Sequence, residues 1–217
     1  MAPIIEVSDS VCSGLDALGI SYTRKDETRD DFIYIPSINL YVAKERTHSG
    51  LNWNDSHKAL EDEGRRMLTP SEFRATLKHL VSNPRNREHT QIYNEITEVK
   101  SPWRAEWIDA YFEQRDDGMY LLTGNKTKAE KLDKSTLMND RTPGISLDSW
   151  VEGSDKEVTS QGLPSKKITK GDLYHWYPRN NVVAIFYALS VRALLYFGRL
   201  PSFGCDDLGV RAAEQRE

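Results

Sequence analysis

Apolar and polar residues alternate in two short runs between residues 32 and 43, and the runs meet at Pro36 and Ser37. A period of two, in segments rich in β-branched and aromatic side chains, is typical of strands that bury one face. We therefore expect two β-strands joined by a turn at Pro36. Another strand is expected over residues 118–122, where Gly118 opens an apolar run.

Other segments carry apolar residues at the spacing of a helix. The clearest helix start is at Thr69, the predicted N-cap, with Pro70 in the first helical position and Glu72 completing a capping box. The apolar stripe of this helix consists of Phe73, Leu77 and Leu80. Further helices are expected over residues 56–63, capped by Asn54 or Asp55 and ended by Gly64, over 90–99 and over 104–115.

Residues 124–171 are polar and rich in Lys, Ser, Thr, Asp and Gly, so we expect long loops with short strands there. The chain of 217 residues fits one domain, 1–217, in which this stretch is a loop-rich insert. Because strands and helices are both predicted, the expected fold class is α+β.

Charge and composition exclude several function classes. The net charge is −4, and no basic cluster exceeds the pairs at 65–66 and 166–167, so we expect no nucleic-acid binding, which needs a basic face. The two cysteines, Cys12 and Cys205, do not have the spacing of metal ligands, and the five histidines form no HExxH motif. We therefore expect no catalysis, no metal site and no cofactor.

Residues 182–200 are largely apolar and long enough for a transmembrane helix. Arg192 lies in the middle of this run and Arg199 near its end, and a central arginine is costly in lipid, so we expect no membrane insertion. The N-terminal residues lack the basic region and apolar run of a secretion signal. We expect synthesis in the cytoplasm, and assembly on a virion or a cell surface remains open.

The last part of the chain has an unusual composition. Residues 179–213 contain no Lys, Glu, Gln, Met or Trp, although these five types supply 39 of the first 178 residues. They are the amino acids that codons ending in a pyrimidine cannot encode. Randomising the adenines of a codon such as AAC gives Asn, Tyr, Ser, Asp, Gly, Ala, Val, Ile, Leu, Phe and a few others, and the window is built from that set.

A frame of regularly placed residues runs through this window. It consists of Asn180, Asn181, Val183, Ala184, Phe186, Ala188, Ser190, Arg192, Ala193, Leu195, Arg199, Pro201, Ser202, Leu208, Gly209, Val210 and Arg211. This frame resembles the variable region of the target proteins of diversity-generating retroelements, in particular the archaeal and archaeal-virus group. In that family an error-prone reverse transcriptase mutates adenines copied from a template, and the protein displays the result on a C-type lectin fold.

A second segment supports the resemblance. Residues 50–73, which include Trp53, Gly64 and Thr69, are similar to the stretch W…A…G-R-x-L-P-T-x-x-E-[FW] of the formylglycine-generating-enzyme branch of C-type lectin folds. The resemblance implies a C-type lectin fold with a small mixed or antiparallel sheet, two or more packed helices and long loops. It also implies that a terminal strand at residues 208–211 pairs with the run at residues 38–42.

The resemblance further implies that residues 180–213 form a variable ligand-binding region, in which residues 185–205 bind an unknown protein or surface ligand. On a strand, Ile185, Tyr187 and Leu189 share one face, which would be exposed, while a strand buried on both faces is the alternative. The predicted ligand-binding residues are Ile185, Tyr187, Leu189, Val191, Leu194, Tyr196, Phe197, Gly198, Leu200, Phe203, Gly204 and Cys205.

Two other functions remain open at this point. An enzyme of the same fold, a formylglycine-generating-type oxidase or a relative, would need a reactive cysteine pair in one pocket, and neither cysteine lies in a matching motif. A structural, self-associating virion protein would bury residues 185–203 in an oligomer interface.

Overall fold

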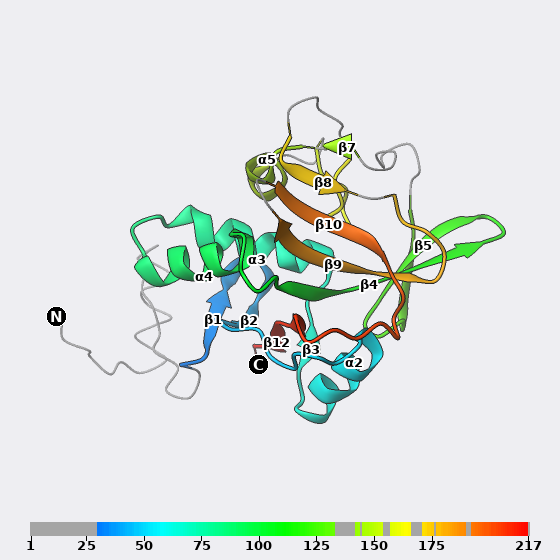
Figure 1. The fold of residues 1–217 in the computed structure, drawn as a ribbon, viewed down its shortest axis with the longest axis horizontal. Coiled ribbons are helices and arrows are strands. Elements are labelled where there is room, and N and C mark those ends of the chain that lie inside the picture. Colours follow the sequence, from blue (N-terminus) through cyan, green and yellow to red (C-terminus); the bar gives the residue numbers. More distant parts are fainter. Residues whose placement is uncertain are drawn as a thin grey trace, which may run out of the picture. The chain divides into compact units, whose positions relative to one another are not determined.

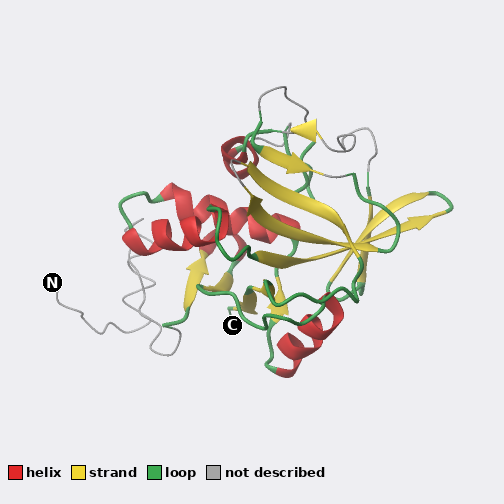
Figure 2. Ribbon diagram, viewed as in Figure 1, coloured by secondary structure: helices red, strands yellow, loops and turns green. Residues whose placement is uncertain are grey.

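Helices cover both faces of a large β-sheet, and a smaller sheet lies beside it (Figures 1 and 2). The structure is a computed structural model that describes residues 30–132, 142–143, 145–153, 157–165, 171–175, 177–189 and 192–216. Within these residues the fold is α+β, as the sequence predicts. Residues 10–18, where the sequence favours either irregular structure or a short helix, lie outside the described residues.

Two sheets organise the fold. The order of the large sheet is β6-β5-β4-β9-β10-β8-β7, and β11 pairs with β4 outside this path. Its strands are β4 (Ala105–Arg115), β5 (Gly118–Thr123), β6 (Lys128–Lys131), β7 (Thr142–Pro143), β8 (Leu173–His175), β9 (Val182–Leu189), β10 (Arg192–Arg199) and β11 (Leu208–Val210). The small sheet, in the order β1-β2-β12-β3, contains β1 (Phe32–Ile35), β2 (Leu40–Ala43), β12 (Ala212–Gln215) and β3 (Arg66–Met67).

The first two strands confirm the prediction for residues 32–43. β1 and β2 pair antiparallel and are joined by the 3-10 turn η1 (Pro36–Ile38). Pro36 suits the start of this turn because its ring holds φ near the helical value. Asn39 closes the turn in the left-handed conformation, which asparagine tolerates better than most residues.

The predicted capping box of α3 (Pro70–Ser82) is present. The Thr69 hydroxyl accepts a hydrogen bond from Glu72 N at 3.4 Å, and the Glu72 carboxylate accepts one from Thr69 N at 3.0 Å. Helix α2 (Trp53–Asp62) starts earlier than predicted, since Asn52 is its N-cap rather than Asn54 or Asp55. The other helices are α4 (Arg87–Thr97) and α5 (Leu147–Glu152).

The helix predicted over residues 104–115 is wrong, because this segment is strand β4. Its apolar residues do not alternate with polar ones since both faces of β4 are buried, and a continuous apolar run imitates a helix pattern. The pairing with β9 also shifts between Ile108 and Tyr111, which breaks the period of two. The buried carboxylates of Glu106 and Asp109 both have partners within the fold.

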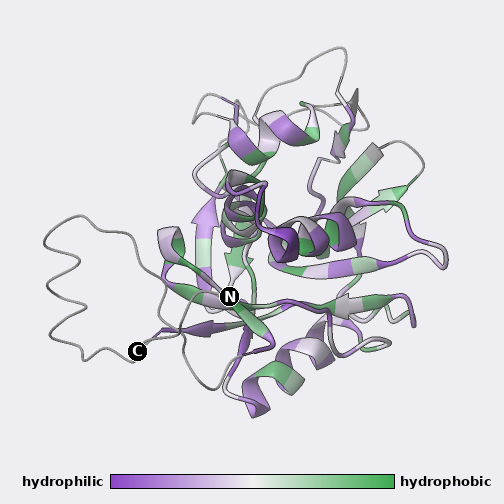
Figure 3. Cartoon of the chain, turned by 90° about the vertical axis from the view of Figure 1, so that its left-hand side faces the viewer, coloured by the Kyte–Doolittle hydropathy of each residue, from purple (hydrophilic) through white to green (hydrophobic). Residues whose placement is uncertain are grey.

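Two apolar clusters occupy the two faces of the large sheet. On one face the core includes Phe73 of α3, Ile92 of α4 and Trp150 of α5, and we call it the α3-side core. On the other face Trp53 and Leu60 of α2 belong to a second cluster, which we call the α2-side core. Figure 3 shows hydrophobic and hydrophilic residues alternating around the helices, as expected when each helix buries one side.

A strand near the C-terminus pairs with β2, as predicted, but it is the strand that follows residues 208–211 and not that segment itself. Residues 208–210 form β11, which runs parallel to β4, and it is β12 that pairs antiparallel with β2. The partner predicted at residues 38–42 is therefore right, and the strand assigned to it was four residues too early. Gly209 lies close to Arg46 and Thr47, where a Cβ atom would come within 2.7 Å of both.

The apolar run at residues 182–200 forms β9 and β10 instead of a helix. Within the part of the chain that the structure describes, no helix has the length and apolar character needed to span a membrane.

Candidate functional site

The window with the unusual composition supplies two central strands of the large sheet and the segment after them. β9 and β10 pair antiparallel, so that Tyr187 lies opposite Leu194 and Ile185 lies opposite Tyr196. Because paired residues of antiparallel strands project from the same face, these four side chains share the face that carries the α2-side core.

The opposite face of β9 belongs to the α3-side core. The ring of Phe186 lies 5.1 Å from the ring of Phe73 and is stacked 6.0 Å from the ring of Trp150. Helices α3 and α5 therefore cover this face at Phe186, which is 1% exposed.

Three of the predicted ligand-binding residues are buried, and their expected exposure is wrong. Ile185, Leu194 and Phe197 are 0%, 2% and 1% exposed. Ile185 is covered because it belongs to the α2-side core, together with Trp53 of α2 and Leu208 of β11. Phe197 projects into the other face, where its ring lies 4.9 Å from Phe112 and 5.3 Å from His175. The alternative of strands buried on both faces thus describes most of β9 and β10, and Val191 lies outside the described residues.

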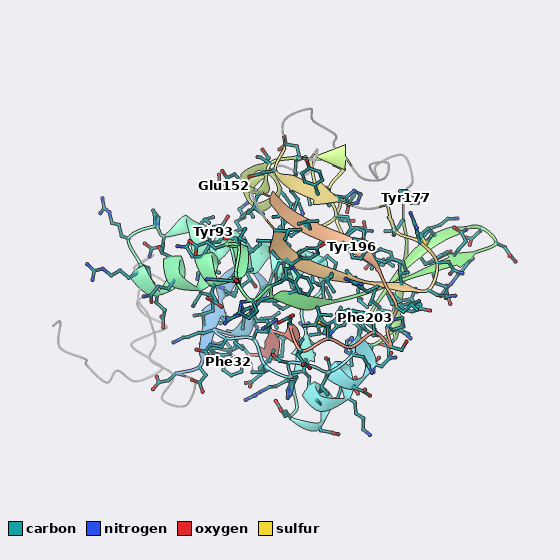
Figure 4. The ribbon with its side chains drawn as sticks, viewed as in Figure 1. Phe32, Tyr93, Glu152, Tyr177, Tyr196 and Phe203 are labelled. Carbon is teal, nitrogen blue, oxygen red and sulfur yellow. The ribbon has the colours of Figure 1, made fainter. Side chains whose placement is uncertain are left out.

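The other predicted residues keep part of their surface exposed. Leu189 and Leu200, at 39% and 59% exposure, are the most open apolar side chains among them. Four members of the set lie partly buried at the edge of the α2-side core, and Figure 4 labels Tyr196 and Phe203 among these. We call the whole set the rim: Tyr187, Leu189, Tyr196, Gly198, Leu200, Phe203, Gly204 and Cys205.

Trp103 extends the rim from outside the window. Its ring meets the ring of Tyr187 edge-on, with centroids 5.1 Å apart, and it is only partly buried. The sequence does not predict this neighbour, because the helix expected over residues 104–115 would not place Trp103 beside β9. As a strand, β4 pairs Ala105 with Tyr187 and brings Trp103 to the same place.

The frame of the window is mostly internal. Ten of its residues are buried: Val183, Ala184, Phe186, Ala188, Ala193, Leu195, Leu208, Gly209, Val210 and Arg211. Asn180 and Asn181 are exposed, and their side chains form hydrogen bonds to β4 at the start of β9. Asn180 Oδ1 accepts a hydrogen bond from Gln114 N, and Asn181 Oδ1 accepts one from the Tyr111 hydroxyl, both at 2.8 Å.

The segment at residues 200–207 is held against the rest of the fold at both ends. Near its start, the Pro201 carbonyl accepts a hydrogen bond from Asn54 N at 3.4 Å. At its end, one Arg46 nitrogen donates to the carbonyls of Asp207 and Ala105. Burial lowers the pKa of the Arg46 guanidinium from its ordinary value. The segment therefore has a defined course while its side chains face outward in part.

A β-bulge at Gly198 changes the direction of the next side chain. Phe197 pairs with Ala184, but Arg199 pairs with Val183, so Gly198 is left without a partner. In a regular strand Arg199 would project from the same face as Phe197. The extra residue instead turns Arg199 to the α2-side face, as bulges do when they redirect a side chain.

Arg199 lies against two aromatic rings of the rim. Its guanidinium carbon is 4.3 Å from the centroid of Phe203 and 5.6 Å from that of Tyr196. The Tyr196 phenol in turn lies across Gly198, where a Cβ atom would come within 2.5 Å of the tyrosine oxygen. Gly198 and Tyr196 therefore depend on each other, and a side chain at position 198 would displace the ring.

A buried histidine and carboxylate lie apart from the rim. His57 Nε2 is 3.3 Å from Asp109 Oδ1, with both side chains 3% exposed. Asp109 also accepts a hydrogen bond from Gly124 N at 2.6 Å, and the His57 ring packs on Trp53. This pair joins α2 to the irregular part of β4. Both side chains are almost wholly buried.

Among the residues with described positions, no three His, Cys, Asp or Glu side chains are grouped as metal ligands. Cys205 is a free thiol there, and its Sγ lies 3.9 Å from Asp207 Oδ2. Cys12 lies outside the described residues.

Comparison with protein families, with curated proteins and with solved structures found no match to this chain.

Proposed function

We propose that this protein binds a ligand through a diversified surface, that it is the target of a diversity-generating retroelement, and that its fold is of the C-type lectin type. Two features support the fold: the pairing of the last strand β12 with the N-terminal strand β2, and the capping box of α3 at the position where the resembling segment requires it. The ligand is a protein or another surface component, and no catalysis is expected.

The observation that carries the proposal is the separation of frame and rim. Ten frame residues are buried, whereas eight of the eleven described positions predicted to vary retain exposed surface. A surface substitution changes stability by about 0.5 kcal/mol or less, while removing a large core side chain costs about 2–5 kcal/mol. A protein that must fold with many different sequences therefore needs its varied positions outside the core, which is the arrangement of the rim.

The three buried positions agree with the same proposal if packing restricts which residues they can accept. Ile185, Leu194 and Phe197 carry residues that adenine-randomised codons can encode, but their surroundings accept only apolar side chains of similar volume. Variants with a polar or much larger side chain at these positions should therefore fail to fold, so folding limits the variation before a ligand can select among variants. The contact surface consists of the rim, extended by Trp103.

The gene provides the first test. We expect a near-copy of the codons for residues 180–213 close to the gene, with differences confined to adenines of the template. Differences spread over all four bases, or the absence of a near-copy from the surrounding genome, would contradict the retroelement assignment.

The protein provides a second test. Codons of the AAC type with randomised adenines are placed at Leu200, Phe203 and Gly204 in one library, and at Ile185, Leu194 and Phe197 in a matched control. Soluble, cooperatively folding clones are then counted. We expect most clones of the first library to fold and few of the second. Equal fractions would show that rim and core do not differ in tolerance.

A further inference from the structure

Arg199 is the point at which the rim carries a fixed positive charge. It belongs to the frame of the window, and the Gly198 bulge turns it toward the rim instead of the core. Its guanidinium packs on the rings of Phe203 and Tyr196, at 4.3 and 5.6 Å from their centroids. Stacking of this kind limits the side chain to few conformations while the edge of the guanidinium can still donate hydrogen bonds.

The guanidinium of Arg199 lacks an acceptor. Its Nε is buried and has no hydrogen-bond partner among the described residues, and within the same residues no carboxylate forms an ion pair with it. Arg211, the other arginine of the frame whose side chain is described, is different. It donates to both carboxylate oxygens of Glu106 at 2.6 and 3.1 Å and to the carbonyls of Ala43 and Lys44.

An unsatisfied buried donor costs free energy, because burial removes its hydrogen bonds to water. The fold gives Arg211 four hydrogen bonds and leaves Arg199 oriented but without an acceptor among the described residues. This difference is expected if the acceptor for Arg199 is supplied by a ligand. A carboxylate is the group whose two oxygens match the planar donor edge of a guanidinium.

We propose that Arg199 is a constant anchor of the rim and binds an Asp or Glu side chain of a protein ligand. This inference rests on the proposed function, since it names the chemistry that a ligand of the rim must present. Phe203 and Tyr196 hold the guanidinium in place in this variant, and the surrounding rim contacts the apolar neighbours of the acidic residue.

The composition of the rim favours a protein over other acidic partners. Tyrosine, phenylalanine and arginine are the residues enriched at the centre of protein–protein interfaces. Polyanions such as nucleic acids or anionic membranes would need several unpaired cations in one face. The rim itself contains no lysine or arginine, Asp206 in the same segment is exposed, and the net charge of the chain is −4.

The test uses a phage-displayed library of random peptides, selected on the full-length protein. Clones that lose binding on the Phe203→Ser variant are kept, because they bind the rim. We expect these peptides to share an Asp or Glu. We expect Arg199→Gln to weaken their binding by about 10- to 100-fold, as for the loss of a hydrogen bond to a charged group. Arg199→Lys, which keeps the charge without the planar fork, should recover part of the affinity.

The matched control is Arg115→Gln. Arg115 also lies over a tyrosine ring, 4.3 Å from the centroid of Tyr120, but outside the rim. It should leave peptide binding unchanged. Replacing the shared acid of the peptide by Asn or Gln tests the same contact without changing the protein. In the Arg199→Gln background this peptide change should cause little further loss, because the two groups act on each other.

The outcomes separate this inference from the proposed function. The role of Arg199 as an anchor is contradicted if the rim-binding peptides share no acidic residue, or if Arg199→Gln does not change their affinity. Either result would still agree with the rim as a binding surface. If no peptide depends on Phe203, both the anchor and the ligand-binding rim fail.

Discussion

The strands β9 and β10 and the segment at residues 200–207 come from one stretch of sequence with one composition, yet they differ in what the fold requires of them. Ile185 in β9 is fully buried, and Phe186 beside it is 1% exposed on the opposite face. In the following segment Leu200 is 59% exposed. Backbone hydrogen bonds fix the course of both parts, but only in the strands do the side chains fill a core.

If the window is diversified as proposed, codon chemistry alone does not decide which of its positions form the surface. Under the proposed function, a position whose codon is open to variation is still restricted by packing where its side chain is buried, as the side chain of Leu194 is at 2% exposure. The tolerant positions are those where a side chain meets solvent on a backbone that other residues hold in place. The predictions below test the two sides of this comparison, beginning with the fixed structure.

Removing residues 208–217 should have the largest effect. This truncation deletes β11 and β12, whose residues Leu208, Val210 and Ala213 are 0% exposed, and it leaves the Glu106 carboxylate without Arg211. We expect an unfolded or aggregated product, because an unpaired buried charge alone costs about 3–5 kcal/mol.

A chain ending at Gln215 is the control for this truncation, because it retains both strands. Its circular dichroism spectrum and melting temperature should stay close to those of the full chain. A soluble 1–207 fragment with an unchanged melting temperature would show that the closing strands do not support the fold.

The second prediction compares the two faces of β9. Phe186→Ala should lower the free energy of unfolding by about 3–5 kcal/mol and Ile185→Ala by about 2–5 kcal/mol, since both side chains are buried. Urea denaturation of the two variants measures the losses. A loss below about 1 kcal/mol for Ile185→Ala would mean that the α2-side face is open, as for a surface site.

Much of the scaffold could be predicted from local sequence signals. The capping box at Thr69, the turn at Pro36 and the strand after Gly118 depend on residues close together in the chain, and all three are present. The start of α2 was predicted too late, because Asn52 and Asn54 both have the chemistry of an N-cap and only tertiary packing of Trp53 selects the first.

The errors concern burial, which depends on what packs against a segment from far away in the sequence. β4 was assigned as a helix because both its faces are covered. The expectation that Phe197 is exposed together with Tyr196 is wrong because neighbouring residues of β10 project from opposite faces, and Phe197 packs on Phe112. The bulge that redirects Arg199 arises from pairing with β9 and has no local signal beyond Gly198. Trp103 and Arg199 could not be recognised as part of the rim for the same reason.

The third prediction concerns Glu72, which supports α3 beneath the buried face of β9. Burial acts to raise the pKa of this carboxyl, but hydrogen bonds and charge from Arg66, together with the bond from Thr69, outweigh it and lower the pKa. A lowered pKa in the folded state stabilises the fold above the ordinary pKa of a glutamate, and this stabilisation is lost as the pH falls through the lowered value.

Glu72→Gln should therefore cost about 1.5–3 kcal/mol at pH 7, as for hydrogen bonds to a charged group, and less as the pH falls through the lowered pKa of Glu72. Denaturation curves at several pH values give the difference between the two proteins. A difference independent of pH would mean that the carboxylate charge contributes nothing.

The fourth prediction is smaller and concerns the other half of the capping box. Thr69→Ala removes the acceptor for Glu72 N and should cost about 1 kcal/mol. Because α3 covers the face of the sheet opposite the rim, ligand binding should be unchanged. Normal stability combined with lost binding would place this helix in the binding site, contrary to the proposal.

The smallest effect on stability is expected at Leu200, the most exposed large apolar residue of the rim. Leu200 is 59% exposed, and it follows directly on Arg199. Leu200→Ser should change the free energy of unfolding by about 0.5 kcal/mol or less, because little of the side chain leaves an apolar environment. The same substitution should weaken peptides selected on the rim, since an exposed leucine beside the anchoring arginine offers apolar surface to a ligand.

Val99→Ser is a suitable control, because Val99 is 48% exposed but lies between α4 and β4, outside the rim. It should match Leu200→Ser in stability and leave peptide binding unchanged. If Leu200→Ser destabilises the protein as strongly as Ile185→Ala, residues 200–207 are part of the core and the distinction between strands and rim is wrong.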